Sequence, residues 1–197
     1  MSPTARRVAR ALFAFAWAIL LGYLFAEVEI QIEGPAGWAT SLPTWRIEHH
    51  WLLDIFWGGR AMTGYHAWVF PFIALFFHFP LVYAGRWSLR DEARILACVM
   101  AFWISEDLLW FVLNPAYGLA HLNPVDAPWH KHWFGGFPSD YSLFGVVAIL
   151  LLGWSCTRPS TEGASLLRSR VQRARIPRTV ERTHRIEQRR QNPDQRR

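Results

Sequence analysis

Residues 103–114 read WISEDLLWFVLN, a segment that is apolar enough to cross a membrane and yet carries two adjacent acidic residues. It ends the third of four apolar blocks, which cover residues 8–26, 66–83, 93–113 and 141–156. A transmembrane helix needs roughly 20 predominantly apolar residues. Three blocks are long enough, and the fourth, which is somewhat shorter, would cross with little tilt. A soluble protein of this size would show shorter, amphipathic segments. The sequence therefore predicts an all-α integral membrane protein, a bundle of four transmembrane helices.

The first block could instead be a cleaved signal peptide, because arginines precede it. Its end, LFAEVE, matches the small residues of a cleavage site poorly. We therefore expect residues 8–26 to remain as a membrane-spanning helix.

Basic residues are distributed unevenly between the segments that flank the blocks. The N-terminus, the loop 84–92 and residues 158–197 hold most of the arginines, whereas the loops 27–65 and 114–140 hold only Arg46, Arg60 and Lys131. Cytoplasmic flanks of membrane helices are enriched in Lys and Arg. We therefore expect a multi-pass protein of the cell membrane, or of the inner membrane in a bacterium. Both termini are predicted to be cytoplasmic and both long loops to face outward.

The net charge of +6 arises mainly from residues 158–197, which hold twelve arginines and four acidic residues. We predict a transmembrane domain over residues 1–157 and a disordered basic tail over 158–197. The tail could also touch anionic lipid headgroups. Because the rest of the chain is slightly acidic, the high pI does not predict a nucleic-acid partner.

The acidic pair in residues 103–114 lies on one helical face. Trp103, Glu106, Asp107, Trp110 and Asn114 share a stripe at helical spacing, while the opposite face is aliphatic and suits lipid. We expect the acids to point into the bundle, with Glu106 roughly 12 Å below the outer end of its helix. An ionised carboxylate at that depth costs several kcal/mol unless a partner compensates it. The two indoles bracket the acids and would keep water away from them.

Histidines supply the candidate partners, because most of the eight lie in the outward loops or near the outer ends of the blocks. If residues 47–56 form a short helix, His50 and Asp54 share a face, and in an extended WHKHW segment His130 and His132 do so as well. Imidazole and carboxylate together suit a divalent metal such as Zn or Fe. The predicted ligands are His50, Asp54, Glu106, Asp107, His130 and His132, with His49, His66 and His121 in reserve.

Other roles for these residues stay open at the level of sequence. An interfacial histidine among tryptophans is often only a headgroup-level amphipath, and the acids could pair with Arg46 or Arg60, or be protonated and hydrogen-bonded to the backbone. Asp140 or Ser139 would make an N-cap for the last block, a structural role that argues against counting Asp140 as a ligand.

Three functions fit these features. The first is a metal-dependent membrane enzyme, a hydrolase or an oxidoreductase, in which Glu106 and Asp107 are ligands or general acid–base groups and the substrate is a lipid or another hydrophobe. The second is a binding or carrier module that moves protons or metal ions. The third is a non-catalytic subunit that packs against other membrane subunits through its Phe-rich second block, with His78 as a possible haem ligand.

Overall fold

The computed structural model describes residues 1–157, so the prediction of a disordered cytoplasmic tail concerns residues outside the described part of the chain. Within these residues, four helices are long and apolar enough to cross a membrane. They are α1 (Pro3–Glu33), α3 (Gly64–Ala84), α4 (Leu89–Leu113) and α5 (Ser139–Cys156). The predicted membrane class and the number of spans are thus supported. Which side of a membrane each loop faces remains a prediction.

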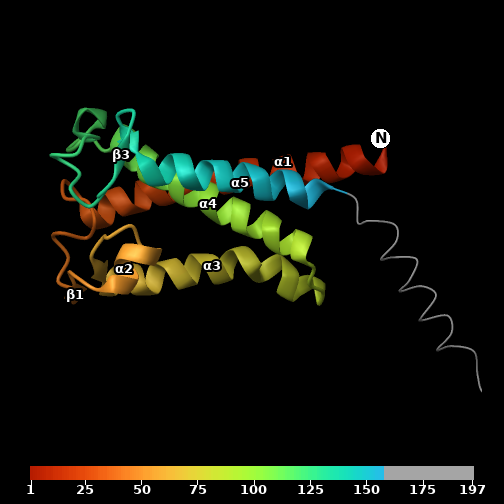
Figure 1. Cartoon of the computed structure of the whole chain (residues 1–197), viewed down its shortest axis with the longest axis horizontal. Coiled ribbons are helices and arrows are strands. Elements are labelled where there is room, and N and C mark those ends of the chain that lie inside the picture. Colours follow the sequence, from red (N-terminus) through yellow and green to blue (C-terminus); the bar gives the residue numbers. More distant parts are fainter. Residues whose placement is uncertain (158–197) are drawn as a thin grey trace, which may run out of the picture. The chain divides into compact units, whose positions relative to one another are not determined.

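The remaining elements are short and belong to the two long loops. The first loop contains β1 (Arg46–Ile47), α2 (Trp51–Phe56) and β2 (Met62–Thr63), and the second contains η1 (Leu119–His121), β3 (Trp133–Phe134) and β4 (Phe137–Pro138). β1 pairs with β2 and β3 with β4, both antiparallel. Gly135 and Gly136 join β3 to β4 with φ of 59° and 84°, the positive values that a tight hairpin turn requires. Both loops lie at the same end of the helices (Figure 1).

Local signals account for the helix ends. The Ser2 hydroxyl accepts from the Ala5 amide at the start of α1, and Ser88 caps α4 in the same way through the Asp91 amide. At the other ends of these two helices, the Asn114 side-chain amide donates to the carbonyl oxygen of Gly34 at 2.8 Å. The contact ties the end of α4 to the end of α1, so the last turns of both helices are held at the same level.

The central helix is α4, which packs extensively against α1 and α5 and much less against α3 (Figure 1). A Cβ atom on Gly22 of α1 would lie 2.8 Å from the carbonyl oxygen of Phe102, so the absence of a side chain allows α1 and α4 to approach closely. In the most apolar window of each helix, 44% of α4 but only 6% of α3 is buried within the protein. α3 is therefore the peripheral helix of the bundle.

Two helices extend beyond the predicted spans at the loop end. The sequence predicted that the first span ends at residue 26, whereas α1 continues to Glu33. Polar residues in EVEIQIE lower the hydropathy there, but Ala26 and Ile30 pack against Trp110 and Phe111 and keep the segment helical. The last span begins at Ser139, and its N-cap is Pro138, which supplies no side-chain hydrogen bond. Asp140 therefore lies in the first turn of α5 and is free for another role.

Candidate functional site

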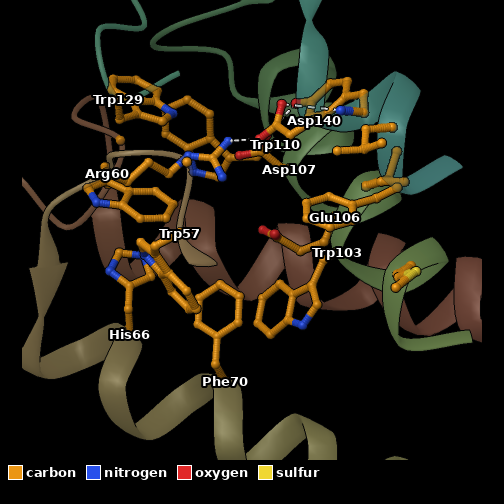
Figure 2. A pocket seen from close by; sticks show the side chains of 18 of the residues that line it. Trp57, Arg60, His66, Phe70, Trp103, Glu106, Asp107, Trp110, Trp129 and Asp140 are labelled. Carbon is orange, nitrogen blue, oxygen red and sulfur yellow. Dashed lines mark hydrogen bonds and ion pairs between the residues drawn. The ribbon is translucent and has the colours of Figure 1, made fainter. Parts of the chain in front are cut away.

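A cavity of about 480 Å³ lies at the loop end of the helices (Figure 2). Its lining has a polar and an apolar part. The polar part holds five acidic residues and one arginine, which are Glu29, Glu33, Glu106, Asp107, Asp140 and Arg60. The apolar part includes Val99, Met100, Ile104, Leu143 and Phe144. The cavity lining thus combines a charged part with an apolar part.

Two of the acids come from the end of α1 that the sequence had assigned to a loop. Glu29 and Glu33 are one helical turn apart and are both buried, with 7% and 4% of their surface exposed. The Tyr65 hydroxyl donates to Glu29 Oε1 at 2.6 Å, and the Ala39 amide donates to Glu33 Oε1. Both donors are neutral groups, and within residues 1–157 neither carboxyl forms a salt bridge.

Glu106 occupies the middle of the cavity wall. It is 4% exposed, and Figure 2 shows its carboxyl directed into the cavity, above the indole of Trp103. Trp103 itself is stacked on Phe70 of α3, with ring centroids 4.0 Å apart. Glu106 is close enough to the carboxyls of Glu29, Asp107 and Glu33 to interact with them electrostatically. Among residues 1–157, Glu106 forms no salt bridge with a basic side chain.

Asp107 is adjacent in sequence but has a different environment. The Tyr141 hydroxyl of α5 donates to Asp107 Oδ2, and Nε2 of the buried His130 lies 3.1 Å from the same oxygen. The His130–Asp107 contact is an ion pair without an aligned hydrogen bond, since Nε2 has no hydrogen-bond partner of good geometry. Asp107 is therefore engaged by protein groups, whereas Glu106 faces the cavity.

His130 lies outside the membrane-spanning helices, and its pKa is raised above the ordinary value. Burial by itself lowers the pKa of His130, but the negative charge of Asp107 and the contacts with the carboxylates of Asp107 and Asp140 outweigh it. The positive charge of Arg60 acts in the opposite direction and only reduces the effect. The protonated imidazole is thus stabilised by the two carboxylates that it joins.

Arg60 joins the two long loops. Its guanidinium donates to Asp140 Oδ2 at the start of α5 and lies beside Nδ1 of His130. It also lies over the indole of Trp38, 5.1 Å from the ring centroid. The loops 27–65 and 114–140, which the sequence alone did not place relative to each other, meet above the end of α4 through these contacts.

His66 lies on the opposite wall, at the start of α3. Its Nδ1 is 2.7 Å from the Thr63 hydroxyl, and its ring stacks on Trp38 with centroids 4.0 Å apart. The sequence placed His66 in reserve as a metal ligand, and the structure brings it to the cavity lining.

The predicted metal ligands divide into two groups. His130 contacts Asp107, Glu106 lines the cavity beside Asp107, and His132 lies at the exposed rim of the cavity. His50 and Asp54 are exposed and do not line the cavity. The residues proposed on sequence grounds therefore do not form one shell, and within residues 1–157 no group of three or more His, Cys, Asp or Glu side chains is placed to hold a metal ion.

The predicted ligands of the first loop stay outside the cavity because of where α2 begins. His50 is the N-cap of this helix, and its Nδ1 accepts from the Leu52 amide at 3.2 Å. The prediction that His50 and Asp54 share a helical face placed His50 inside the helix, and that is wrong. The reserve candidates His49 and His121 are also exposed, the latter packed on Tyr117 with ring centroids 4.7 Å apart.

Sequence reasoning missed four residues of this site. Glu29 and Glu33 were assigned to a loop, Asp140 was interpreted as a cap, and Tyr141 was not considered. The i, i+4 spacing of Glu29 and Glu33 was a usable signal, because it continues the helical face that carries Ala26 and Ile30. Nothing in the sequence indicates the pairing of Tyr141 with Asp107.

No family model, curated protein or solved structure matches this chain. The chemistry of the cavity itself is therefore the guide to function. It offers carboxyl groups for hydrogen bonding, charge pairing or proton transfer, indole walls, and an apolar extension between helices.

Proposed function

We propose that the protein binds an amphipathic, lipid-like molecule in this cavity, with the polar head against the acidic residues and the hydrocarbon chain along α4. The observation that carries the proposal is the buried carboxyl of Glu106, which faces the cavity and forms no salt bridge with a basic side chain of residues 1–157. Trp57 and Trp110 also line the cavity, and their buried Nε1 atoms have no hydrogen-bond partner within residues 1–157. Buried polar groups of this kind cost free energy until a partner arrives.

The apolar part of the lining supports a hydrocarbon chain. Val99, Met100 and Ile104 lie along α4 below the acids, and Leu143 and Phe144 of α5 border them on one side. α3 lies on the other side and buries little of its surface against the bundle. A chain that enters from the bilayer between α3 and α5 would reach the acids without crossing a polar loop.

Acid–base catalysis on the bound molecule is a second candidate, and the position of Glu106 favours it. A buried carboxyl that faces a ligand cavity can give or take a proton, whereas Asp107 is engaged by Tyr141 and His130 and suits a positioning role. A metal-dependent hydrolase or oxidoreductase, a carrier, and a subunit of a larger membrane complex remain predictions from the sequence.

Photolabelling tests the proposed binding. The full-length protein, reconstituted in lipid nanodiscs, is irradiated with a dodecyl alcohol that carries a diazirine in its chain, and the labelled peptides are mapped by mass spectrometry. We expect labels to concentrate on residues 99–104 and 143–144. Leu143→Trp, which fills the apolar part, should reduce labelling of residues 99–104.

The matched control is Ile149→Trp on the same helix. Ile149 is 66% exposed, about as much as Leu143 at 62%, but it does not line the cavity. Labels spread evenly over the lipid-facing surfaces, or equal labelling in both variants, would contradict the proposal.

A further inference from the structure

We propose that the head group recognised in this cavity is an organic cation, a protonated or quaternary amine. This inference rests on the proposed binding of an amphipathic molecule and names its chemical class. It follows from the charges that the protein itself pairs, from the indoles of the cavity wall, and from the spacing of the acids.

Charge pairing within the cavity is incomplete. Arg60 forms a salt bridge with Asp140, and His130 faces Asp107, so two of the five lining acids have a basic partner. Glu29, Glu33 and Glu106 form no salt bridge within residues 1–157. The donors to Glu29 and Glu33 are a tyrosine hydroxyl and a backbone amide, which satisfy oxygen atoms without adding positive charge.

Three buried carboxyl groups beside one another are unfavourable when they are ionised and unaccompanied. Each loses its hydration on burial, and like charges repel strongly where water is excluded. Glu106 interacts with Glu29, and each of the three is at most 7% exposed. A cation in the cavity would relieve both costs at once, whereas an anionic head group would add to them.

The cavity walls suit a cation that carries carbon. Five indoles line it, those of Trp38, Trp57, Trp103, Trp110 and Trp129. The face of an aromatic ring attracts a positive charge within about 6 Å, and indole does so best. The protein already uses this contact, since the guanidinium of Arg60 lies 5.1 Å from the centroid of the Trp38 ring.

The spacing of the acids favours an organic cation over a metal ion as the bound species. A metal requires several ligand atoms at about 2.0–2.6 Å from one point, and within residues 1–157 no group of His, Cys, Asp or Glu offers such an arrangement. An alkylammonium head is larger and is bound by diffuse charge and ring faces, so it tolerates carboxyl groups that surround it at greater distances. A cavity of about 480 Å³ has room for such a head together with part of its chain.

The test compares head groups on one chain length. The full-length protein in a non-ionic maltoside detergent is titrated with dodecyltrimethylammonium, dodecanol or dodecyl phosphate, and bound molecules are counted by native mass spectrometry. We expect the ammonium compound to bind about tenfold or more tightly than the other two. Glu106→Gln, which keeps the side-chain shape, should remove most of that preference. Glu48→Gln, a change of the same charge at an exposed site away from the cavity, should leave it intact.

Each outcome decides a different point. Equal binding of all three amphiphiles, or a preference for the phosphate, would overturn the cationic head group and leave the proposed binding of an amphiphile standing. Absence of binding by all three would overturn both. If Glu106→Gln unfolds, Glu29→Gln removes a neighbouring carboxylate from the same cluster and replaces it in the comparison, while the head-group series on the unchanged protein still decides the preference.

Discussion

Replacing Gly22 by alanine tests the close approach of α1 and α4, on which the juxtaposition of Glu29 and Glu106 depends. A Cβ atom at this position would lie 2.8 Å from the carbonyl oxygen of Phe102 and 3.2 Å from the amide nitrogen of Glu106. Both are backbone atoms, so no side-chain rotation relieves the contact. The two helices would have to separate or shift along each other.

The magnitude follows from two opposing effects. Alanine is favoured over glycine within a helix by about 0.8–1.0 kcal/mol, and overpacking a well-packed contact costs about 1–3 kcal/mol. Gly145→Ala in α5 provides the matched control, because its added Cβ would meet nothing within 4 Å. Gly145→Ala is thus expected to stabilise the protein by up to about 1 kcal/mol. The difference between the two variants isolates the clash and should amount to about 1–3 kcal/mol.

Reversible denaturation in mixed micelles, followed by tryptophan fluorescence, gives the free energy of unfolding of both variants. Because the Cβ also meets the turn of α4 that carries Glu106, Gly22→Ala should in addition weaken amphiphile binding, while Gly145→Ala should not. If both variants stabilise the protein equally, α1 and α4 do not pack as closely as described, and the placement of Glu29 beside Glu106 loses its basis.

The contacts of Asp107 and Asp140 give three further predictions. Tyr141→Phe removes a donor to the buried Asp107 and should lower the free energy of unfolding by about 1–3 kcal/mol; an unchanged denaturation midpoint would argue against the contact. Folding raises the pKa of His130. The protonated side chain therefore makes its full contribution to the free energy of unfolding below the unfolded-state pKa of about 6.5. This contribution is lost as the pH rises through the folded-state pKa. Denaturation midpoints should therefore decline over this window for the unchanged protein and respond less to pH in His130→Gln, and parallel profiles would refute the assignment. Arg60→Met should cost about 1–3 kcal/mol because it removes the charged donor to Asp140 Oδ2, and the cost should shrink when Asp140→Asn is added; additive effects in this double-mutant cycle would show that the two side chains are not coupled.

The four spans could be predicted because hydrophobicity over a helix length is a local property of the chain. The face shared by Trp103, Glu106 and Trp110 was equally accessible, since helical periodicity places side chains without knowledge of the neighbours. Within that face, however, both acids were predicted to have the same role. Glu106 meets the cavity and Asp107 meets Tyr141 because α1 and α5 flank α4 on different sides, which is a property of the packing.

The errors concern residues whose role depends on contacts distant in sequence. Hydropathy underestimates the length of α1, because Glu29 and Glu33 are polar and yet are buried by tertiary contacts. The N-cap preference of Asp is real, but the salt bridge with Arg60, 80 residues away in sequence, determines the position of Asp140. His50 illustrates a subtler limit, since the short helix begins at residue 51 and not at residue 47, which changes a predicted ligand into a cap.

The sparse packing of α3 has a consequence for how the surrounding membrane acts on the protein. Little protein surface holds α3 to the rest of the bundle, so in a bilayer acyl chains would occupy much of the space around it and their lateral pressure would act on its distance from α5. A more ordered bilayer, richer in saturated chains, would press α3 inward and slow the exchange of a molecule between the cavity and the lipid. Exchange rates would then follow the fluidity of the membrane, even though no residue of the cavity has changed.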